Sequence, residues 1–287
     1  MKKLFALLVT LTFVFTLAAC TDSSDEGVIV GIDPGAGIMA ATDEAIETYG
    51  LDYELEASSG PVMMTELEQA YENEEFVVVT GWEPHYMFAD YDLKFLEDPE
   101  GVYGDVENIH TIARKDIRDD LPDVATFLED FYMTGEELGG LMGDMNEFGD
   151  DMTELEIARQ WMSENTELYE AWLPENIDGT DKTVDLYYVN WAEGVAMTYL
   201  VAAILEDEGY TVTTTEADPG IVFTTIAQGD ADAFLDGWLP VTHGSYQEQY
   251  EDDYLDLGYN FEGARIGLVV PSYVEIDSID ELNDLLE

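Results

Sequence analysis

The feature of this sequence that most limits its fold is the alternation of short apolar runs with longer segments of helical periodicity. In the first part of the chain, residues 28–32, 53–57 and 76–80 have the composition of buried strands, and predicted helices at 38–49 and 61–73 separate them. Short apolar runs bounded by turn residues are typical of strands, whereas apolar residues spaced three or four apart indicate helices. This order predicts an α/β fold with a largely parallel sheet.

The alternation returns in the second part of the chain, after a mostly helical stretch from about 121 to 175. Further strands are predicted at 184–189, 211–215, 233–235 and 266–270, and further helices at 192–208, 220–228 and 279–286. The polar, turn-forming segment 176–182 is predicted to be a linker. Two α/β lobes are therefore expected.

The N-terminus has the pattern of a secretory signal. Two lysines precede an apolar run at 4–19, and the run ends at Cys20, the single cysteine of the chain. The preceding Leu-Ala-Ala resembles a bacterial lipobox, after which the cysteine is lipid-modified. Polar and acidic residues follow directly, so a spanning helix of ~20 apolar residues is not expected. We expect a signal peptide at 1–20, a lipidated Cys20, a tether at 21–27 and anchoring at the extracellular face of the cytoplasmic membrane.

Acidic residues far outnumber basic ones. The chain has 65 Asp and Glu residues against 9 Lys and Arg, with a formal net charge of -56. Such a surface repels nucleic acid, which excludes a nucleic-acid-binding role. The hydrophobic share of 46% separates the chain from acidic disordered segments. We infer a halophilic source, since at ~1 M salt a Debye length of ~3 Å screens the repulsion among the acids.

Three tryptophans lie where predicted strands end. A Gly-Trp-x-Pro turn occurs at 81–84 and again at 237–240, and it places Trp82 and Trp238 just after two strands. Trp191 follows the strand predicted at 184–189. In open α/β sheets the carboxyl ends of the strands face the ligand crevice. The three indoles are therefore expected to converge on one cleft.

Core packing is the simpler interpretation of a tryptophan, and we expect it for Trp161 and Trp172, which lie within helical patterns. The other three differ because each lies at a strand-to-loop turn beside Gly, Asn or Pro, where a large side chain points into an opening. A box of aromatic rings suits a quaternary ammonium group, since cation–π attraction contributes ~0.5 to 2 kcal/mol per desolvated ring.

A zwitterion also needs an anion site, and the glycine-rich loop at 35–38 is a candidate. Its glycines allow free backbone N–H groups at a helix N-terminus to approach a carboxylate. His243 can donate a further hydrogen bond. The loop alone is a weak signal, because Gly35-x-Gly37-x-x-Ala40 also fits a dinucleotide fingerprint. A nicotinamide would be scarce outside the cell, so no cofactor is expected.

Catalysis is not expected either. The sequence has no Gly-x-Ser-x-Gly elbow, no His-Glu-x-x-His motif and no second cysteine. An acidic segment starting at Asp144 suggests a calcium loop, but Phe148 and Leu155 occupy positions that need oxygen ligands. A solvated acidic face is the simpler interpretation, and no metal site is predicted.

These motifs together resemble a known family, the OpuA-type glycine betaine and proline betaine binding lipoproteins of Gram-positive bacteria, over nearly all of the mature length. The segments that carry the resemblance are GIDPGAGIM, VVVTGWEPHYMF, YDLKFLEDPEGVYGDVENIHTIARK, YVNWAEGVA, DGWLPVTH and GLVVPSY. The resemblance implies a solute-binding protein of an ABC importer in osmoprotection. Its partners would be a small zwitterion and the membrane-embedded permease subunits, with the protein itself a monomer.

The resemblance also implies a two-lobed periplasmic-binding-protein-like fold of type II, with the ligand cleft between the lobes. Lobe A is expected at 28–112 plus 273–287 and lobe B at 113–272. The expected ligand residues are a three-Trp box for the trimethylammonium group and a carboxylate site of two backbone N–H groups and a histidine: Trp82, Trp191, Trp238, Gly37, Ile38 and His243.

Some choices stay open from the sequence. Glu83 and Asp236 flank box tryptophans, where they either attract the cation or belong to the solvated surface; His85 and His110 are given no role. Choline or carnitine is the alternative ligand in the same fold. Choline lacks a carboxylate, so it would leave His243 and the loop amides unpaired at a cost of ~1 to 3 kcal/mol.

Overall fold

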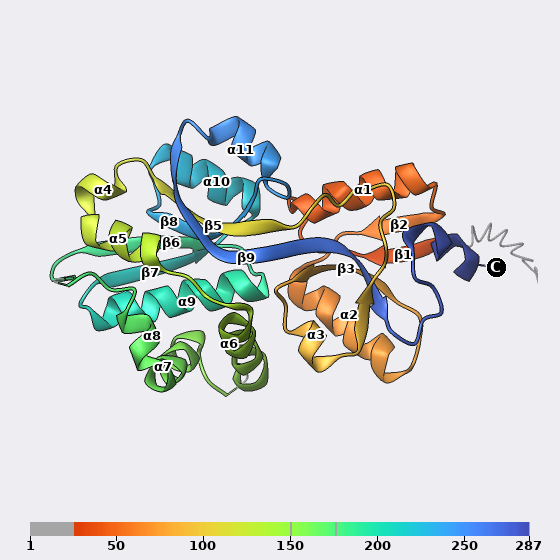
Figure 1. Ribbon diagram of the computed structural model, residues 1–287, viewed down its shortest axis with the longest axis horizontal. Coiled ribbons are helices and arrows are strands. Elements are labelled where there is room, and N and C mark those ends of the chain that lie inside the picture. Colours follow the sequence, from red (N-terminus) through yellow and green to blue (C-terminus); the bar gives the residue numbers. More distant parts are fainter. Residues whose placement is uncertain (1–25, 150, 176, 287) are drawn as a thin grey trace, which may run out of the picture.

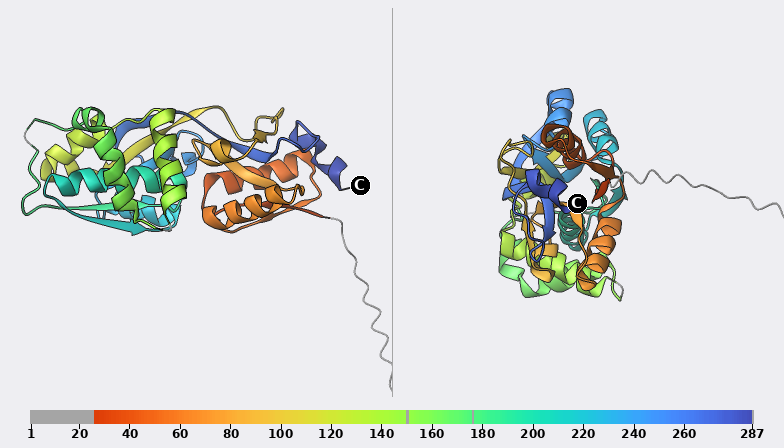
Figure 2. Two further views of the ribbon diagram at one scale, coloured as in Figure 1. Left: turned by 90° about the horizontal axis from the view of Figure 1, so that it is seen from below. Right: turned by 90° about the vertical axis from the view of Figure 1, so that its right-hand side faces the viewer.

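The computed structural model describes residues 26–149, 151–175 and 177–286. The expected signal peptide, Cys20 and most of the tether lie outside these residues. Two α/β halves lie side by side, and the long strand β9 (Tyr254–Pro271) runs through both (Figure 1). Seen from below, the strands that connect the halves run along one side of the molecule (Figure 2). The predicted two-lobed α/β fold is confirmed.

The first half is built on a sheet in the order β2-β1-β3-β9, with β4 also paired to β9. Its strands are β1 (Gly27–Val30), β2 (Tyr53–Glu56), β3 (Val78–Glu83) and β4 (Leu93–Phe95), and its helical elements are α1 (Gly37–Tyr49), α2 (Gly60–Glu72), α3 (Met87–Asp90) and the 3-10 helix η1 (Ile279–Leu285). Strand β1 is parallel to β2 and β3, whereas β9 is antiparallel to β3. Helices α1 and α2 cover opposite faces of this sheet (Figure 1).

The second half continues the sheet in the order β9-β5-β8-β6-β7. Its strands are β5 (Glu107–Arg114), β6 (Thr183–Tyr188), β7 (Thr211–Glu216) and β8 (Ala233–Leu239). Its helices are α4 (Ile117–Asp120), α5 (Pro122–Asp130), α6 (Gly135–Phe148), α7 (Glu154–Glu164), α8 (Thr166–Glu170), α9 (Ala192–Asp207), α10 (Pro219–Gln228) and α11 (Gly244–Tyr250). Helix α9 is apolar around most of its circumference, and it is buried between this sheet and α6 and α7.

The strand order brings functional loops together. The carboxyl ends of β1, β3, β6 and β8 all lie where the two halves meet (Figure 1). Helix α1 begins at Gly37 after β1, and α9 begins at Ala192 directly after Trp191. The loops after these four strands therefore line the boundary between the halves.

Some elements differ from the sequence prediction. The helix predicted at 279–286 is present, and it is the 3-10 helix η1. The predicted linker near 177–182 joins α8 to β6 within the second half. The sequence predicted a strand only at 266–270, whereas β9 starts at Tyr254, because polar residues and bends at Gly258 and Gly263 (φ 105° and 92°) interrupt its apolar pattern.

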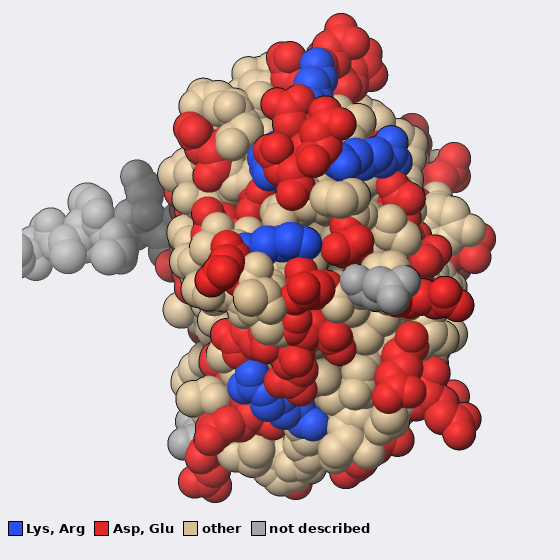
Figure 3. Space-filling view, turned by 90° about the vertical axis from the view of Figure 1, so that its left-hand side faces the viewer, with Lys and Arg blue, Asp and Glu red and all other residues tan. Residues whose placement is uncertain are grey.

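Acidic side chains dominate the face shown in Figure 3. Every Lys and Arg among the residues that the structure describes forms an ion pair; these residues are Lys94, Arg114, Lys115, Arg118, Arg159, Lys182 and Arg265. Most acids therefore have no basic neighbour. Within the described ranges, no helix has both the length and the apolar character needed to cross a membrane.

Candidate functional site

A small cavity lies between the two halves. Its walls come from the ends of β3 and β8, the loops after β1, β6 and β8, the first turns of α1 and α9, and β9: Ile32, Ala36, Ile38, Trp82, Trp191, Glu193, Trp238, Thr242 and Ile266. The three tryptophans expected to converge do so, and each is at most 4% exposed. Trp161 and Trp172 belong to the hydrophobic core, as predicted.

Each box indole is held by a carboxylate. The hydrogen bonds from indole Nε1 to carboxylate oxygen are Trp82 to Glu193 at 2.8 Å, Trp238 to Asp236 at 2.8 Å, and Trp191 to Asp33 at 3.3 Å. A bond at the nitrogen edge fixes the ring orientation, and charge-assisted bonds of this kind are stronger than neutral ones. The acids thus orient the aromatic walls of the cavity.

Two of these acids are fully buried. Glu193 is 1% exposed and Asp236 is 0% exposed, and neither takes part in an ion pair among the described residues. In each carboxylate one oxygen accepts an indole N–H, while Glu193 Oε1 and Asp236 Oδ2 have no hydrogen-bond partner. Burial raises the pKa of Asp236 to about 7. Burial and the neighbouring Asp236 raise the pKa of Glu193 well above its ordinary value.

The glycine-rich loop opens α1 beside the cavity. Ala36 is the N-cap and has no side-chain capping bond; the Met39 N–H bonds to the Ala36 carbonyl oxygen, whereas the N–H groups of Gly37 and Ile38 have no intrahelical partner. Ile38 is buried in the cavity wall. A Cβ on Gly37 would overlap the carbonyl oxygen of Thr242, so only glycine allows the two halves to approach this closely here.

His243 is buried behind the aromatic wall. Its ring is stacked on Trp191 with centroids 5.7 Å apart, and its Nδ1 accepts the backbone N–H of Trp238 at 2.9 Å. The ring proton is therefore on Nε2, which has no partner. Burial lowers the pKa of His243 to about 3, so the ring is neutral. The side chain has one N–H donor without a partner, but it lies behind Trp191 and is not among the residues that line the cavity.

Several hydrogen bonds connect the halves around the cavity. Besides Trp82 with Glu193 and Trp191 with Asp33, the Tyr246 hydroxyl donates to the carbonyl oxygen of Gly35 at 3.0 Å. The halves are thus closed upon one another. This closure brings the α1 loop of the first half against the loop after β8 of the second.

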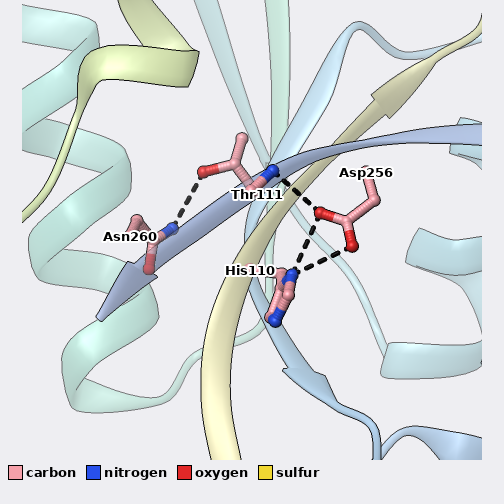
Figure 4. Close-up of polar contacts among 5 residues, drawn as sticks. His110, Thr111, Asp256 and Asn260 are labelled. Atoms are coloured by element: carbon pink, nitrogen blue, oxygen red, sulfur yellow. Dashed lines mark hydrogen bonds and ion pairs between the residues drawn. The ribbon is translucent and has the colours of Figure 1, made fainter. Parts of the chain in front are cut away.

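The structure places the remaining candidates differently. Asp236 belongs to the buried site, whereas Glu83 is partly exposed and pairs with Arg265. His85 is buried and meets the Trp82 ring edge-on, with centroids 4.6 Å apart. His110 on β5 bonds through Nδ1 to Asp256 at 3.0 Å (Figure 4), and it does not line the cavity.

Sequence reasoning missed Glu193 and Asp33. Glu193 is in the first turn of α9, where an acid is ordinary because it complements the helix dipole. The available signal was its position, since it is flanked by a long apolar helical run with no acid until Glu206. Asp33 comes directly after the strand predicted at 28–32, much as Trp82 and Trp238 lie at the ends of theirs, and position alone would have made it a candidate.

Comparisons with known proteins show the family of this chain. Residues 17–164 and 182–287 match the family model OpuAC, described as the substrate binding domain of ABC-type glycine betaine transport system. The chain is 39% identical over 300 residues to the glycine betaine/carnitine transport binding protein GbuC of Listeria monocytogenes serotype 1/2a, and the alignment covers 98% of both proteins.

Two solved structures are also similar. Lactococcal OpuAC in its closed-liganded conformation with glycine betaine is 35% identical, with 51% of this chain and 57% of that chain covered and a TM-score of 0.47. The glycine betaine/L-proline-binding protein ProX from Borrelia burgdorferi is 33% identical, with 52% and 56% covered and a TM-score of 0.49. Each alignment spans little more than half of the solved chain.

Proposed function

This chain belongs to the OpuAC family of substrate-binding domains of ABC-type glycine betaine transport systems, and on that premise we propose that it captures glycine betaine for osmoprotection. Proline betaine, which shares the quaternary ammonium and the carboxylate, is a further expected ligand. The observation that carries the proposal is the convergence of Trp82, Trp191 and Trp238 on one cavity, whose wall also includes Ile38 in the first turn of α1.

The aromatic walls suit the cationic end of the ligand. A trimethylammonium group has no N–H donor, so it is recognised through its charge and its methyl surface. The faces of three desolvated rings attract such a cation with ~0.5 to 2 kcal/mol each. The buried carboxylates of Glu193 and Asp236 next to the indoles favour positive charge in the same place.

The donors suit the anionic end. The first N–H groups of α1, at Gly37 and Ile38, are free to bind a carboxylate at a helix N-terminus. The Nε2–H of His243 has no partner in the closed protein, and an unpaired buried donor costs ~1 to 3 kcal/mol. A ligand carboxylate would relieve this cost, which supports a zwitterion over a simple cation.

Carnitine is the second candidate ligand, because the Listeria relative carries both names. The small size of the cavity in the closed arrangement favours the most compact zwitterion. We therefore expect glycine betaine to bind more tightly than carnitine, and both more tightly than choline.

The test is calorimetric titration of lipid-free protein starting at Thr21, in about 1 M salt where repulsion among acids is screened. Glycine betaine, proline betaine, carnitine and choline are compared on the wild type and on Trp238→Ala. Micromolar binding of glycine betaine that the substitution abolishes supports the proposal. Binding of choline in preference to all three zwitterions would contradict it, as would equal binding by the variant.

We also propose that the protein is a monomer tethered through lipid on Cys20, and that its closed form docks on the permease subunits. Fractionation of cells that express the wild type or Cys20→Ala tests the tether. The wild type is expected with the membranes and the variant in the medium. Membrane association of the variant would contradict the lipid anchor.

A further inference from the structure

We propose that Glu193 and Asp236 together form a protonatable counter-ion for the ligand, so that capture of the cation expels a proton from this pair. The inference rests on the proposed function. In the step, the O–H bond of one carboxylic acid breaks, its proton passes to the solvent buffer, and the carboxylate that remains is neutralised by the quaternary ammonium charge. No oxidant or other reactant is needed.

The geometry places both acids at the cation end of the cavity. Glu193, in the first turn of α9, is itself part of the cavity wall. Asp236, on β8, lies behind it: a Cβ on Gly194 would be only 2.6 Å from Asp236 Oδ2, so this oxygen lies against the first turn of α9. The pair thus comes from two elements and backs two of the three rings, Trp82 and Trp238.

In each acid, one carboxyl oxygen accepts a hydrogen bond from an indole N–H and the other oxygen has no partner. The two unpartnered oxygens do not bond to each other in this arrangement. Two buried, adjacent carboxylates cannot both be ionised without a positive partner, since desolvation and mutual repulsion favour the neutral acid. An empty site with these contacts therefore keeps a proton on the pair at neutral pH. The raised pKa values of Asp236 and Glu193 agree with this argument.

The surroundings supply no full positive charge. His85 and His243 are buried, and burial lowers the pKa of each to about 3, so both are neutral. Asp33, on the loop after β1, adds negative charge when ionised. On β9, Arg265 is engaged by Glu83. The N-terminus of α9 contributes only the partial charge of its dipole. The positive charge that neutralises the pair of acids therefore comes from the ligand.

The sign of the pH dependence follows. A bound cation favours the ionised pair and lowers its pKa relative to the empty protein. Affinity therefore rises with pH between the bound and the free pKa, and it is constant above the free value, which for Asp236 is about 7. For release of one proton the dissociation constant increases up to about tenfold for each pH unit below that value. The two neutral histidines do not titrate in this range.

The experiment is calorimetry of the wild-type protein with glycine betaine from about pH 5 to about pH 8 at constant salt, in pairs of buffers with different ionisation enthalpies. The proton number comes from the dependence of the heat on the buffer. We expect release of up to one proton per ligand near pH 6, falling toward zero above the free pKa. The carbon isostere 3,3-dimethylbutanoate, with the same shape but no positive charge, should release none.

Variants separate charge from shape. Glu193→Gln and Asp236→Asn keep an oxygen that accepts the indole N–H but remove the acid. Each is expected to weaken the binding of glycine betaine at least tenfold and to reduce the number of protons released. Glu72→Gln, which removes an exposed acid of α2 that does not line the cavity, is the control and should leave the pH profile unchanged.

The outcomes are distinct. Tight binding by the wild type with equal heats in all buffers and no pH dependence would overturn the proton coupling and leave the proposed function intact. Failure of the wild type to bind glycine betaine at any pH would instead contradict the proposed function. If both variants fail to fold, as judged by tryptophan fluorescence, the wild-type proton number alone decides.

Discussion

Trp82 and Glu193 come from opposite halves of the molecule, and a buried hydrogen bond of 2.8 Å joins them. The indole belongs to the end of β3, and the carboxylate belongs to the first turn of α9. Opening the cleft would break this bond and expose both groups to water. The same contact that orients one wall of the box therefore also stabilises the closed arrangement.

The affinity for glycine betaine should fall in steps as more of the Trp191 ring is removed. Trp191→Phe keeps an aromatic face but loses the bond to Asp33, and we expect about tenfold weaker binding of glycine betaine, while Trp191→Ala loses the ring and should weaken binding about a hundredfold. Calorimetric titration measures both. Equal affinities for the two variants would mean that the ring face contributes nothing.

Gly37→Ala is expected to block closure rather than folding, because the added Cβ overlaps Thr242 only when the halves meet. Binding of glycine betaine should fall at least a hundredfold, with the melting temperature of the ligand-free protein little changed. Gly139→Ala, in α6 with open space around the new Cβ, is the control and should bind normally. Normal binding by Gly37→Ala would argue against this closed geometry.

His243→Phe keeps an aromatic ring against Trp191 but removes the Nε2–H donor, and it also removes the Nδ1 acceptor of the Trp238 N–H, a loss that affects both ligands alike. We expect the binding of glycine betaine to weaken about ten- to a hundredfold, corresponding to ~1 to 3 kcal/mol, while the binding of choline is affected much less. The measured quantity is the ratio of the two affinities. His110→Asn, which alters the Asp256 contact away from the cavity, is the control and should keep the wild-type ratio (Figure 4). A parallel loss for both ligands would indicate a purely structural role.

Asp236→Asn should stabilise the empty protein in a pH-dependent way. Because the folded pKa of Asp236 is raised above its unfolded value, the folded state holds a proton that the unfolded state loses, and stability declines as pH rises toward about 7. The gain in melting temperature from the substitution should thus be larger near pH 8 than near pH 5. Thermal unfolding at both pH values measures it, and an equal gain at both would contradict the raised pKa.

Added salt should raise the melting temperature. The 65 acids face 9 bases, and every base in the described part of the chain is already paired, so screening removes far more repulsion than attraction. We expect an increase of several degrees between ~0.1 M and ~1 M salt. Sucrose at equal osmolality controls for general exclusion effects. A melting temperature that does not rise with salt would contradict the inferred adaptation.

The sequence predicted the α/β architecture and the meeting of three tryptophans because both depend on local patterns: apolar runs, turn residues and the rule that strand ends face the crevice. It could not predict that acids hold the indoles. Glu193 meets Trp82, 111 positions away, and such pairing depends on how the halves close.

The lobe boundaries expected at 112/113 and 272/273 remain predictions. From the strand pairing we propose that the chain passes between the halves just before Glu107, where β5 joins the second sheet, and again near Ala264. On one side of this point β9 pairs with β5, and from Arg265 onward it pairs with β3. Apolar pattern alone does not indicate which neighbour a strand pairs with.

The continuity of β9 has a mechanical consequence. Since one strand is hydrogen-bonded into the sheets of both halves, the halves cannot slide past one another or separate by translation without losing a ladder of backbone bonds. The two halves can still rotate relative to one another, and this rotation would twist the backbone where β9 changes its partner from β5 to β3. Gly263, at φ 92°, lies beside that change of partner, where the absence of a side chain permits such torsion. Small torsions there become large displacements at the distant rim of the cleft.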